Sequence, residues 1–201
     1  MTARLGTLFM TLMLLSGCTS MKPVDFEGAE PRLIIEEYFA GETRAWGLFE
    51  DRFGRVRRQF TVDISGTWDG SELVLDERFL YSDGERDRRV WKITKTGEHS
   101  YEGQAGDVIG IAKGEAYGNA LNWRYDMDLK VGDGTLRVHF NDWMYLQPSG
   151  VLINKARVSK FGIDIGEVTL AFMKSEKTAA VTGAAFAGPP AVRVAARAAS
   201  R

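Results

Sequence analysis

This sequence has few cysteines and histidines and a net charge close to zero, and each of these features excludes a class of function. The 201 residues include one cysteine, Cys18, and two histidines, His99 and His139, and the formal net charge is −1. A single cysteine excludes an intrachain disulfide and a cysteine-rich metal site. A net charge near zero provides no global field that attracts nucleic acid, so we expect no nucleic-acid partner.

Sequence motifs of well-known catalytic sites are also absent. There is no GxSxG nucleophile elbow, no Walker phosphate loop and no HExxH pair. His99 and His139 fall in different predicted strands or turns, and His139 lies on the polar face of its strand, where we expect it to be exposed. The sequence therefore predicts no metal site and no cofactor.

Carboxylates are the remaining candidates for catalysis. Asp107, Glu115 and Asp142 stand beside apolar residues or glycine, and two of them together could perform general acid–base chemistry. The alternative is that they pair with arginines, which "DRFGRVRR" and "DGERDRR" supply in number. Because perturbed carboxylates also occur in purely structural networks, we expect a protein that is not an enzyme.

What the sequence does contain begins with an apolar run at the N-terminus. Arg4 supplies a positive charge, Leu5–Leu15 is mostly apolar, and Ser16 and Gly17 are small. This is the layout of a secretory signal peptide, and the run is shorter than the about 20 residues of a membrane-spanning helix. Residues 1–17 are therefore predicted to be a signal peptide.

The single cysteine follows this signal directly. Leu15-Ser16-Gly17-Cys18 resembles the lipobox of bacterial lipoproteins, in which the cysteine thiolate takes a diacylglyceryl group. The resemblance implies a mature chain that starts at Cys18, carries acyl chains such as palmitate and is anchored in the cell envelope. Thr19, in place of aspartate, favours the periplasmic face of the outer membrane. An ordinary signal peptide with a chance cysteine is the alternative.

Two segments flank the predicted folded domain at its N-terminal side. Residues 18–30 are polar and read as a tether. Residues 31–41 read as one short helix, because Pro31 suits a first helical turn and Gly41 suits a helix end.

The C-terminal segment, residues 174–201, differs in composition from the rest. It is rich in alanine, contains Pro189-Pro190 and shows no alternation, which predicts a mostly disordered tail. We expect a solvated tail without a role. The alternative is contact with anionic lipid or polysaccharide through arginines that recur every four residues, namely Arg193, Arg197 and Arg201.

From Gly41 onward, apolar and polar residues alternate. The clearest examples are "VRRQFTVDISGTW", "LNWRYDMDLKV" and "LRVHFNDWMYL". Strict alternation indicates half-buried antiparallel strands, and turn sequences such as "YSDGER" and "VGDGT" separate them. We expect one all-β domain of about nine or ten strands within residues 31–173.

Many long strands joined by tight turns need a way to hide their sheet edges. Closure into an antiparallel up-and-down β-barrel achieves this, with the short helix at one end. The dense glycines of "GQAGDVIGIAKGEAYGN" indicate bulges or bends where the sheet curls. A two-sheet sandwich is the alternative architecture.

Aromatic residues are frequent on the apolar faces, which would meet inside the barrel. They line ligand pockets as readily as they fill a core, so a ligand-binding interior and a packed interior both remain open. Arg58 lies on the apolar face of its strand, where it would meet a ligand carboxylate or phosphate, or a buried aspartate such as Asp142. The candidate ligand-binding residues are Arg58, Phe60, Trp68, Trp91, Trp123, Tyr125, Phe140 and Asp142.

Several long motifs resemble one family of bacterial lipoproteins, that of domain of unknown function 3833. They include "WGLFEDRFGRVRRQFTVDISGTWDG", "YSDGERDRRVWKI", "GDVIGIAKGEAYGNALNWRYDMDL", "NDWMYL" and "SKFGIDIGEVTLAF". Asn141 stands where the family has an aspartate, which weakens any role for a carboxylate there. The resemblance implies a lipocalin-like, or calycin-like, fold. It also implies a lipid ligand, because family members are encoded near fatty-acid-modifying enzymes.

The sequence therefore predicts a lipid-anchored barrel on the periplasmic face of the outer membrane that binds or carries an apolar ligand, either fatty acid or phospholipid. One alternative is a structural envelope protein with a fully packed barrel. The other is a lipid-modifying enzyme that uses a carboxylate.

Overall fold

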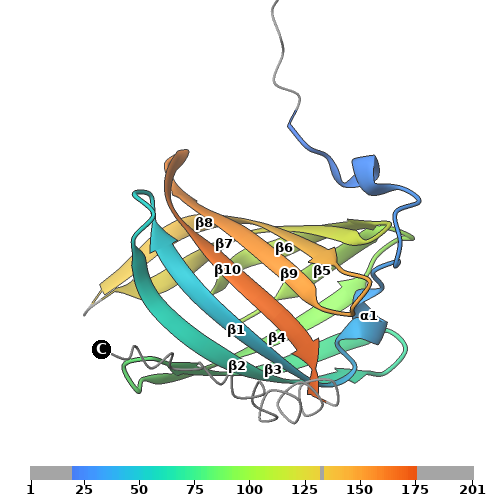
Figure 1. Ribbon diagram of the computed structural model, residues 1–201, viewed down its shortest axis with the longest axis horizontal. Helices are drawn as coiled ribbons and strands as arrows, with labels where there is room; N and C mark the ends of the chain where they lie inside the picture. The colour runs from blue at the N-terminus through green and yellow to red at the C-terminus, as the bar shows by residue number, and fades with distance from the viewer. Residues whose placement is uncertain (1–19, 132–133, 176–201) are drawn as a thin grey trace, which may run out of the picture.

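The computed structural model describes residues 20–131 and 134–175. These residues form a closed antiparallel barrel in which each strand pairs with its neighbours in the chain and the last strand pairs with the first (Figure 1). The ten strands are β1 (Gly41–Asp51), β2 (Val56–Trp68), β3 (Glu72–Tyr81), β4 (Arg86–Lys95), β5 (Ser100–Gln104), β6 (Val108–Tyr117), β7 (Ala120–Val131), β8 (Gly134–Leu146), β9 (Leu152–Lys160) and β10 (Ile163–Lys174). The predicted up-and-down barrel is confirmed.

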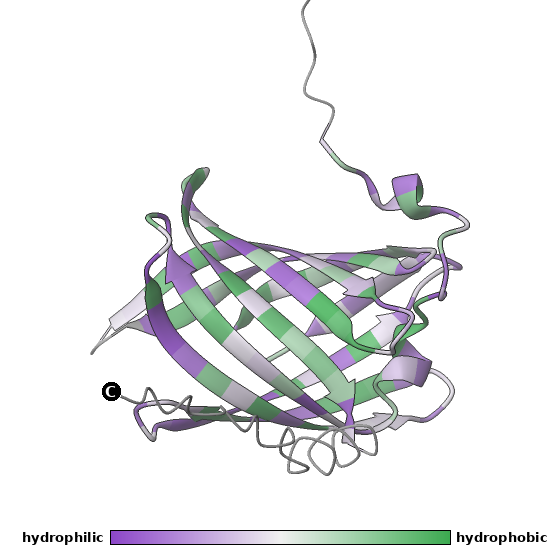
Figure 2. Cartoon of the chain, viewed as in Figure 1, coloured by the Kyte–Doolittle hydropathy of each residue, from purple (hydrophilic) through white to green (hydrophobic). Residues whose placement is uncertain are grey.

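The alternation seen in the sequence is the alternation between the inside and the outside of this barrel. In β9, for example, Leu152, Asn154, Ala156 and Val158 are buried, while Ile153 and the residues between the others are exposed. Figure 2 shows the same banding of hydrophilic and hydrophobic residues along the strands. Within the described residues, no helix has the length and hydropathy needed to cross a membrane.

One end of the barrel is covered by the segment that precedes β1. Leu33, Ile35 and Phe39 are buried there, and the backbone N–H of Leu33 donates to the carbonyl of Gly118 in the β6–β7 turn at 2.8 Å. Tyr38 donates from its hydroxyl to the carbonyls of Gly150 and Phe172. The segment thus contacts several strands and turns around this covered end.

The predicted helix over residues 31–41 is much shorter in the structure. Only α1 (Ile35–Tyr38) is helical, a single turn. Ile34, directly before it, is extended, because the preceding Leu33 is buried at the barrel end and its backbone bonds to the β6–β7 turn. Contacts with the barrel thus override the helical pattern of the isolated segment.

Gly66 in β2 makes room for this cover. A Cβ atom at this position would overlap the backbone carbonyl of Phe39. Only glycine therefore allows the α1 segment to approach the barrel wall this closely.

Part of the predicted tether also lies against the barrel. A short 3₁₀ helix, η1 (Pro23–Phe26), precedes the cover, and the ring of Phe26 packs against Trp143 and Tyr145 at centroid distances of 5.8 and 5.5 Å. The Phe26 ring thus fixes this stretch of the predicted tether against the outer wall. The signal peptide, Cys18 and the tail beyond residue 175 lie outside the described residues.

The strands themselves determine which end is open. In an up-and-down barrel alternate hairpins turn at opposite ends, so the β1–β2, β3–β4, β5–β6, β7–β8 and β9–β10 hairpins all turn at the end opposite α1 (Figure 1). Residues 20–175 thus contain all ten strands, the closing β1–β10 pair and the cover. They constitute a complete folding unit.

Candidate functional site

The interior of the barrel holds a cavity of about 830 Å³. Its lining comes from every strand except β5 and β6 and continues to the open end, where Arg58, Glu85, Arg86 and Lys130 border it. The interior is therefore not fully packed, as the alternative of a purely structural barrel would require. A volume in this range suits a ligand of the size that protein pockets commonly bind.

Glycines in the wall keep aromatic rings out of the middle of the cavity. Gly103 and Gly114 lie against the indole ring of Trp123, and a Cβ atom on either would overlap that ring. Gly47 lies against the ring of Phe60 in the same way. Because these rings lie flat on bare backbone, large aromatic residues form the wall without filling the space that they enclose.

The deepest part of the lining is an aromatic cluster. The ring of Trp91 meets those of Trp123 and Tyr125 edge to face, with centroids 5.9 and 5.4 Å apart. Tyr125 in turn stacks on Phe140 at 5.0 Å. Such contacts add to the stability gained by burying these rings, so this wall is rigid.

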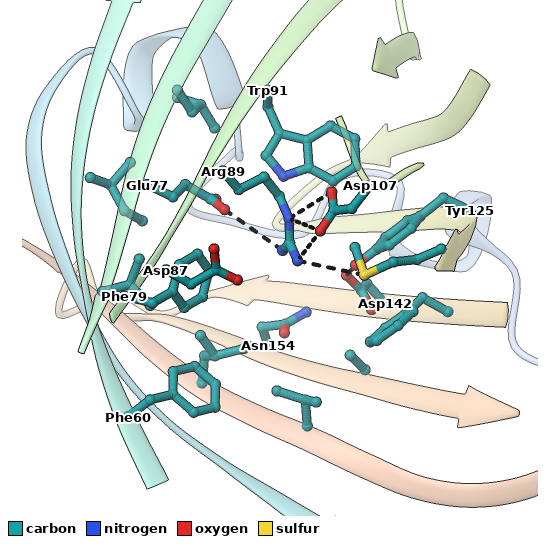
Figure 3. Close-up of a pocket in the computed structure, with 18 of the residues that line it drawn as sticks. Phe60, Glu77, Phe79, Asp87, Arg89, Trp91, Asp107, Tyr125, Asp142 and Asn154 are labelled. Atoms are coloured by element: carbon teal, nitrogen blue, oxygen red, sulfur yellow. Dashed lines mark hydrogen bonds and ion pairs between the residues drawn. The ribbon is translucent and has the colours of Figure 1, made fainter. Parts of the chain in front are cut away.

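A group of polar side chains interrupts the apolar lining, and we call it the polar belt. It consists of Glu77, Arg89, Asp107, Tyr125 and Asp142 (Figure 3). Arg89 donates from Nε and Nη2 to the carboxylate of Asp107, with distances of 2.8 to 3.1 Å. Its Nη1 lies 3.9 Å from the carboxylate of Glu77, the residue directly opposite on β3. Arg89 is thus held between two carboxylates.

Burial and neighbouring charges shift the pKa values in the polar belt. Burial acts to lower the pKa of Arg89, but the carboxylates of Glu77 and Asp107 outweigh it and raise that pKa. Burial raises the pKa of Glu77 to about 7 despite the nearby guanidinium. The net result is one firmly charged cation beside a carboxyl group that takes up a proton near neutral pH.

Asp142 is the most unusual member of the belt. Burial raises the pKa of its carboxyl group to about 7, although Tyr125 donates a hydrogen bond to Oδ2 at 3.3 Å. Its other oxygen, Oδ1, is buried and has no hydrogen-bond partner among the described residues. Burial and the nearby Asp142 carboxyl likewise raise the pKa of Tyr125. A buried acceptor without a donor destabilises the fold.

At the open end, Arg58 is held in place by its surroundings. Its guanidinium lies 3.5 Å from the centroid of the Tyr81 ring and forms ion pairs with Asp83, at 2.9 Å, and with Glu85. The alternative in which Arg58 pairs with Asp142 is wrong, because Arg89 is the arginine whose charge acts on Asp142. Nε of Arg58 is buried without a partner among the described residues.

The structure brings most of the candidate residues together. The cavity is lined by Arg58, Phe60, Trp91, Trp123, Tyr125, Phe140 and Asp142. Trp68 is the exception, because it lies at the end of β2 near the covered end and packs against the core without lining the cavity.

Sequence reasoning missed several lining residues on β3 and β4. Glu77, Phe79 and Tyr81 alternate along β3 on the same side as the buried Leu75, and Arg89 shares its side of β4 with Trp91. The alternation of "ELVLDERFLY" and "RDRRVWKITK" carries this signal. It is masked because charged residues occupy inward positions in both strands.

The other polar candidates have different surroundings. Glu115 is exposed on the outer face of β6, so it does not join Asp107 and Asp142 at the cavity. His139 is exposed and its Nδ1 lies 2.9 Å from Asp126, whereas His99 stacks on the ring of Tyr117. In the part of the chain that the structure describes, no group of three or more histidine, cysteine, aspartate or glutamate residues could hold a metal ion.

A closed antiparallel barrel with one end covered and an aromatic cavity open at the other is the architecture of barrels that enclose one small ligand. The chain belongs to the family described as "Protein of unknown function (DUF3833)", whose model matches residues 12–174. This confirms the resemblance seen in the sequence. No curated protein matches the chain.

Among solved structures, the barrel is similar to the S-type phycobiliprotein lyase CPES from Guillardia theta. The two share 9% sequence identity with a TM-score of 0.52, over 69% of this chain and 89% of the lyase. At this identity the similarity concerns the fold alone.

Proposed function

We propose that this protein binds an elongated apolar ligand, the acyl chain of a fatty acid or phospholipid, inside its barrel. The observation that carries the proposal is the cavity of about 830 Å³ lined mainly by aromatic and aliphatic side chains. Acyl chains require an apolar wall with few polar contacts, and most of this lining provides that.

One side of the cavity suits an acyl chain best. The lining residues of β1, β2 and β10 are all apolar apart from Arg58. The polar belt lies on the opposite side, on β3, β4, β7, β8 and the β5–β6 turn. In the proposed complex, the acyl chain of the ligand therefore lies along the apolar side of the cavity. That side is formed by Phe49, Phe60, Val62, Ile64, Val168, Leu170 and Phe172.

The charges that line the cavity favour the open end as the position of the ligand's head group. The polar belt combines three carboxyl groups with a single guanidinium, which disfavours an anionic group at that depth. The mouth of the cavity is lined by three cations, Arg58, Arg86 and Lys130, and by three carboxylates, Glu85, Asp87 and Asp128. Two of these carboxylates are already paired, Glu85 with Arg58 and Asp128 with Arg137. An acidic head group accordingly stays beside these cations while the acyl chain extends inward.

The energetics permit this function. Burial of about 14 methylene groups would contribute up to about 11 kcal/mol at about 0.8 kcal/mol each, before the costs of association. Micromolar affinity requires about 8 kcal/mol. About 3 kcal/mol of the burial term can thus be lost to association and ordering while micromolar affinity remains.

The proposal includes the location of the protein. Cys18 carries the lipid anchor, and the barrel is held at the periplasmic face of the outer membrane. Replacement Cys18→Ser is expected to leave an unprocessed precursor or a soluble periplasmic protein, as seen by membrane fractionation and by the mass of the mature chain. If this variant still loses its first 17 residues and remains with the outer membrane, Cys18 is not the anchor.

The ligand is tested by filling the cavity. Ala156 on β9 lines it, and the adjacent Lys155 is exposed on the outer face. The chain from Ser20 to Arg201 is expected to carry bound lipid in native mass spectrometry and to respond to palmitate by tryptophan fluorescence. Ala156→Trp should abolish both signals, whereas Lys155→Trp should retain them.

The outcomes distinguish the alternatives. A chain that carries no lipid and shows no response to palmitate or phospholipid at high micromolar concentration excludes the carrier function. Equal binding by Ala156→Trp and Lys155→Trp would show that lipid binds outside the barrel. Conversion of the added lipid into a product would favour the enzyme alternative, in which Asp142 and Glu77 exchange protons near neutral pH.

A further inference from the structure

Two hairpins lie side by side at the open end. They are the β1–β2 hairpin, with its turn at residues 52–55, and the β9–β10 hairpin, with its turn at residues 161–162 (Figure 1). The N–H of Arg52 donates to the carbonyl of Ile165 at 3.0 Å, which joins the two hairpins near their tips. We call the two turns and their flanking residues the rim tips.

The rim tips expose large apolar side chains. Phe161 is 93% exposed and Phe53 is 73% exposed, and the flanking Ile163 and Val56 are also exposed. In Figure 2 the β9–β10 tip is coloured as hydrophobic. Single exposed apolar residues are ordinary, but four on two neighbouring hairpins form a patch that marks an interaction site.

The backbone at Phe161 strengthens this inference. Its φ angle is +52°, in the left-handed region, and it is the one residue other than glycine with a positive φ in the described chain. Glycine or asparagine is usual at such a turn position, since a bulky residue there costs about 1 to 2 kcal/mol. The ring is almost fully exposed, so little packing in the free protein offsets this cost, and a role of the ring outside the fold would account for it.

Cations surround the two rings. The guanidinium of Arg52 lies 4.9 Å from the centroid of the Phe53 ring, and the ammonium of Lys160 lies 5.2 Å from that of Phe161. Several acidic residues nearby already form ion pairs, such as Asp83 with Arg58. Within residues 20–131 and 134–175, the basic residues of the open end that form no ion pair with a carboxylate are Arg52, Arg55, Arg86, Lys130 and Lys160.

We propose that the rim tips dock the open end of the barrel onto an anionic phospholipid bilayer, with Phe53 and Phe161 inserted among the head groups. Exposed aromatic rings beside unpaired cations are the combination that binds an anionic lipid surface, because the rings enter the interface and the cations meet the phosphates.

This surface is separate from the predicted attachment at Cys18. In the N-terminal segment, Phe26 packs on Trp143 and Tyr145 near the end of β8, toward the covered end and away from the rim tips. The docking proposal does not rest on the proposed function, since it needs no ligand inside the cavity. If both hold, the mouth of the cavity opens directly against lipid.

Vesicle co-sedimentation tests the proposal on the chain from Ser20 to Arg201, which has no lipid anchor. We expect binding to vesicles of phosphatidylcholine and phosphatidylglycerol in a three-to-one ratio, weaker binding in high salt, and little binding to pure phosphatidylcholine. Phe53→Ser and Phe161→Asn should each weaken binding about tenfold. That factor equals about 1.4 kcal/mol, near the low end for burying a phenylalanine side chain.

The matched control is Trp46→Ser, which removes an exposed aromatic residue from the outer wall of the same strand as the β1–β2 tip. It should bind vesicles as the unchanged chain does, and circular dichroism should show that all variants are folded. Vesicle binding by the Phe53→Ser/Phe161→Asn double variant equal to that of the unchanged chain overturns the proposal. The proposal is also overturned if the unchanged chain does not bind anionic vesicles but forms a dimer that the double variant does not form. The rim tips would then bind a second copy of the protein.

Discussion

The two ends of the barrel differ in almost every physical respect. At the covered end the side chains of Leu33, Ile35 and Phe39 are buried, and a glycine in the wall is required for their backbone to fit. At the open end two phenylalanines are exposed, one of them on strained backbone, and cations lack partners. The comparison indicates that the covered end contributes more to the stability of the fold than the open end does.

At the covered end the buried carboxylate of Glu36 has hydrogen-bond donors for both of its oxygens. Burial acts to raise its pKa, but hydrogen bonds from Lys95 at 2.8 Å and Tyr101 at 3.0 Å outweigh that and lower it. The polar belt reaches the opposite result at Asp142, whose Oδ1 has no partner and whose pKa is raised to about 7. The carboxyl group of Glu36 at the covered end is thus fully hydrogen-bonded, whereas that of Asp142 at the cavity is not.

The largest effect on stability is expected from a substitution at Gly66, which lies against the backbone of the segment that covers the barrel end. Gly66→Ala would place a methyl group onto the carbonyl of Phe39, and relief requires the cover to move. We expect the free energy of unfolding to fall by about 3 kcal/mol or more, measured by urea denaturation. Gly106→Ala at the open end is the control, because nothing lies within 4 Å of its Cβ position, and it should change stability by less than about 0.5 kcal/mol. Equal losses for the two would remove the contrast between the ends.

The next effect concerns pH and the polar belt. The folded protein keeps a proton on Asp142 up to about pH 7, whereas the unfolded chain releases it near 3.8. The free energy of unfolding should therefore fall as pH rises from about 4 to about 7 and level off above that. Asp142→Asn keeps the shape without the charge and should raise stability at pH 8 by about 2 kcal/mol, with little change at pH 4.

The control for this comparison is Asp126→Asn on the outer face of β7, where the carboxylate is exposed beside His139. Its unfolding profile against pH should parallel that of the unchanged chain. A variant Asp142→Asn that is equally destabilised at pH 4 and pH 8 would show that the buried carboxylate forms a necessary interaction in its charged state.

A smaller effect is expected at the rim tips. Phe161→Asn places a residue that tolerates left-handed backbone at φ +52° and should raise the free energy of unfolding by about 1 kcal/mol. Phe53→Ser, at a position without a positive φ, should leave stability nearly unchanged. Thermal denaturation distinguishes the two, and a loss of stability in Phe161→Asn would mean that the exposed ring packs in solution.

The smallest effect is expected from the C-terminal tail. Deletion of residues 181–201 should shift the melting temperature by less than about 2 °C, because this stretch has no apolar periodicity to bury. Differential scanning calorimetry of the shortened chain tests this. A drop of several degrees would show that the tail docks on the barrel and contributes to one of its ends.

The sequence predicts the barrel wall well because alternation is a local signal. In "LNWRYDMDLKV", Trp123, Tyr125 and Met127 are buried while Arg124 and Asp126 are exposed, as the period of two requires. The same rule identifies most of the cavity lining, including Phe140 and Asp142. What fails is the boundary of the short helix, because the contacts of Leu33 with a distant turn decide it.

The charged contacts inside the barrel could not be predicted in the same way. Arg58 and Arg89 both lie on inward faces, yet which carboxylate each meets depends on strand register and on the β3–β4 and β5–β6 turns. Glu77 lies opposite Arg89 only because β3 and β4 pair in one register out of several. The cavity itself also could not be predicted from the sequence, because it depends on glycines that lie beside aromatic rings from other strands.

The pairing of β1 with β10 has a consequence for how the protein is made. The strand that begins the barrel finds its last partner more than 100 residues later, at contacts such as Thr43 with Lys174. Closure therefore waits until the chain is almost complete, and contacts of such long separation slow folding. Until then β1 presents an unpaired edge, which invites aggregation. A chain that emerges N-terminus first thus depends on protection of that edge until its final strand arrives.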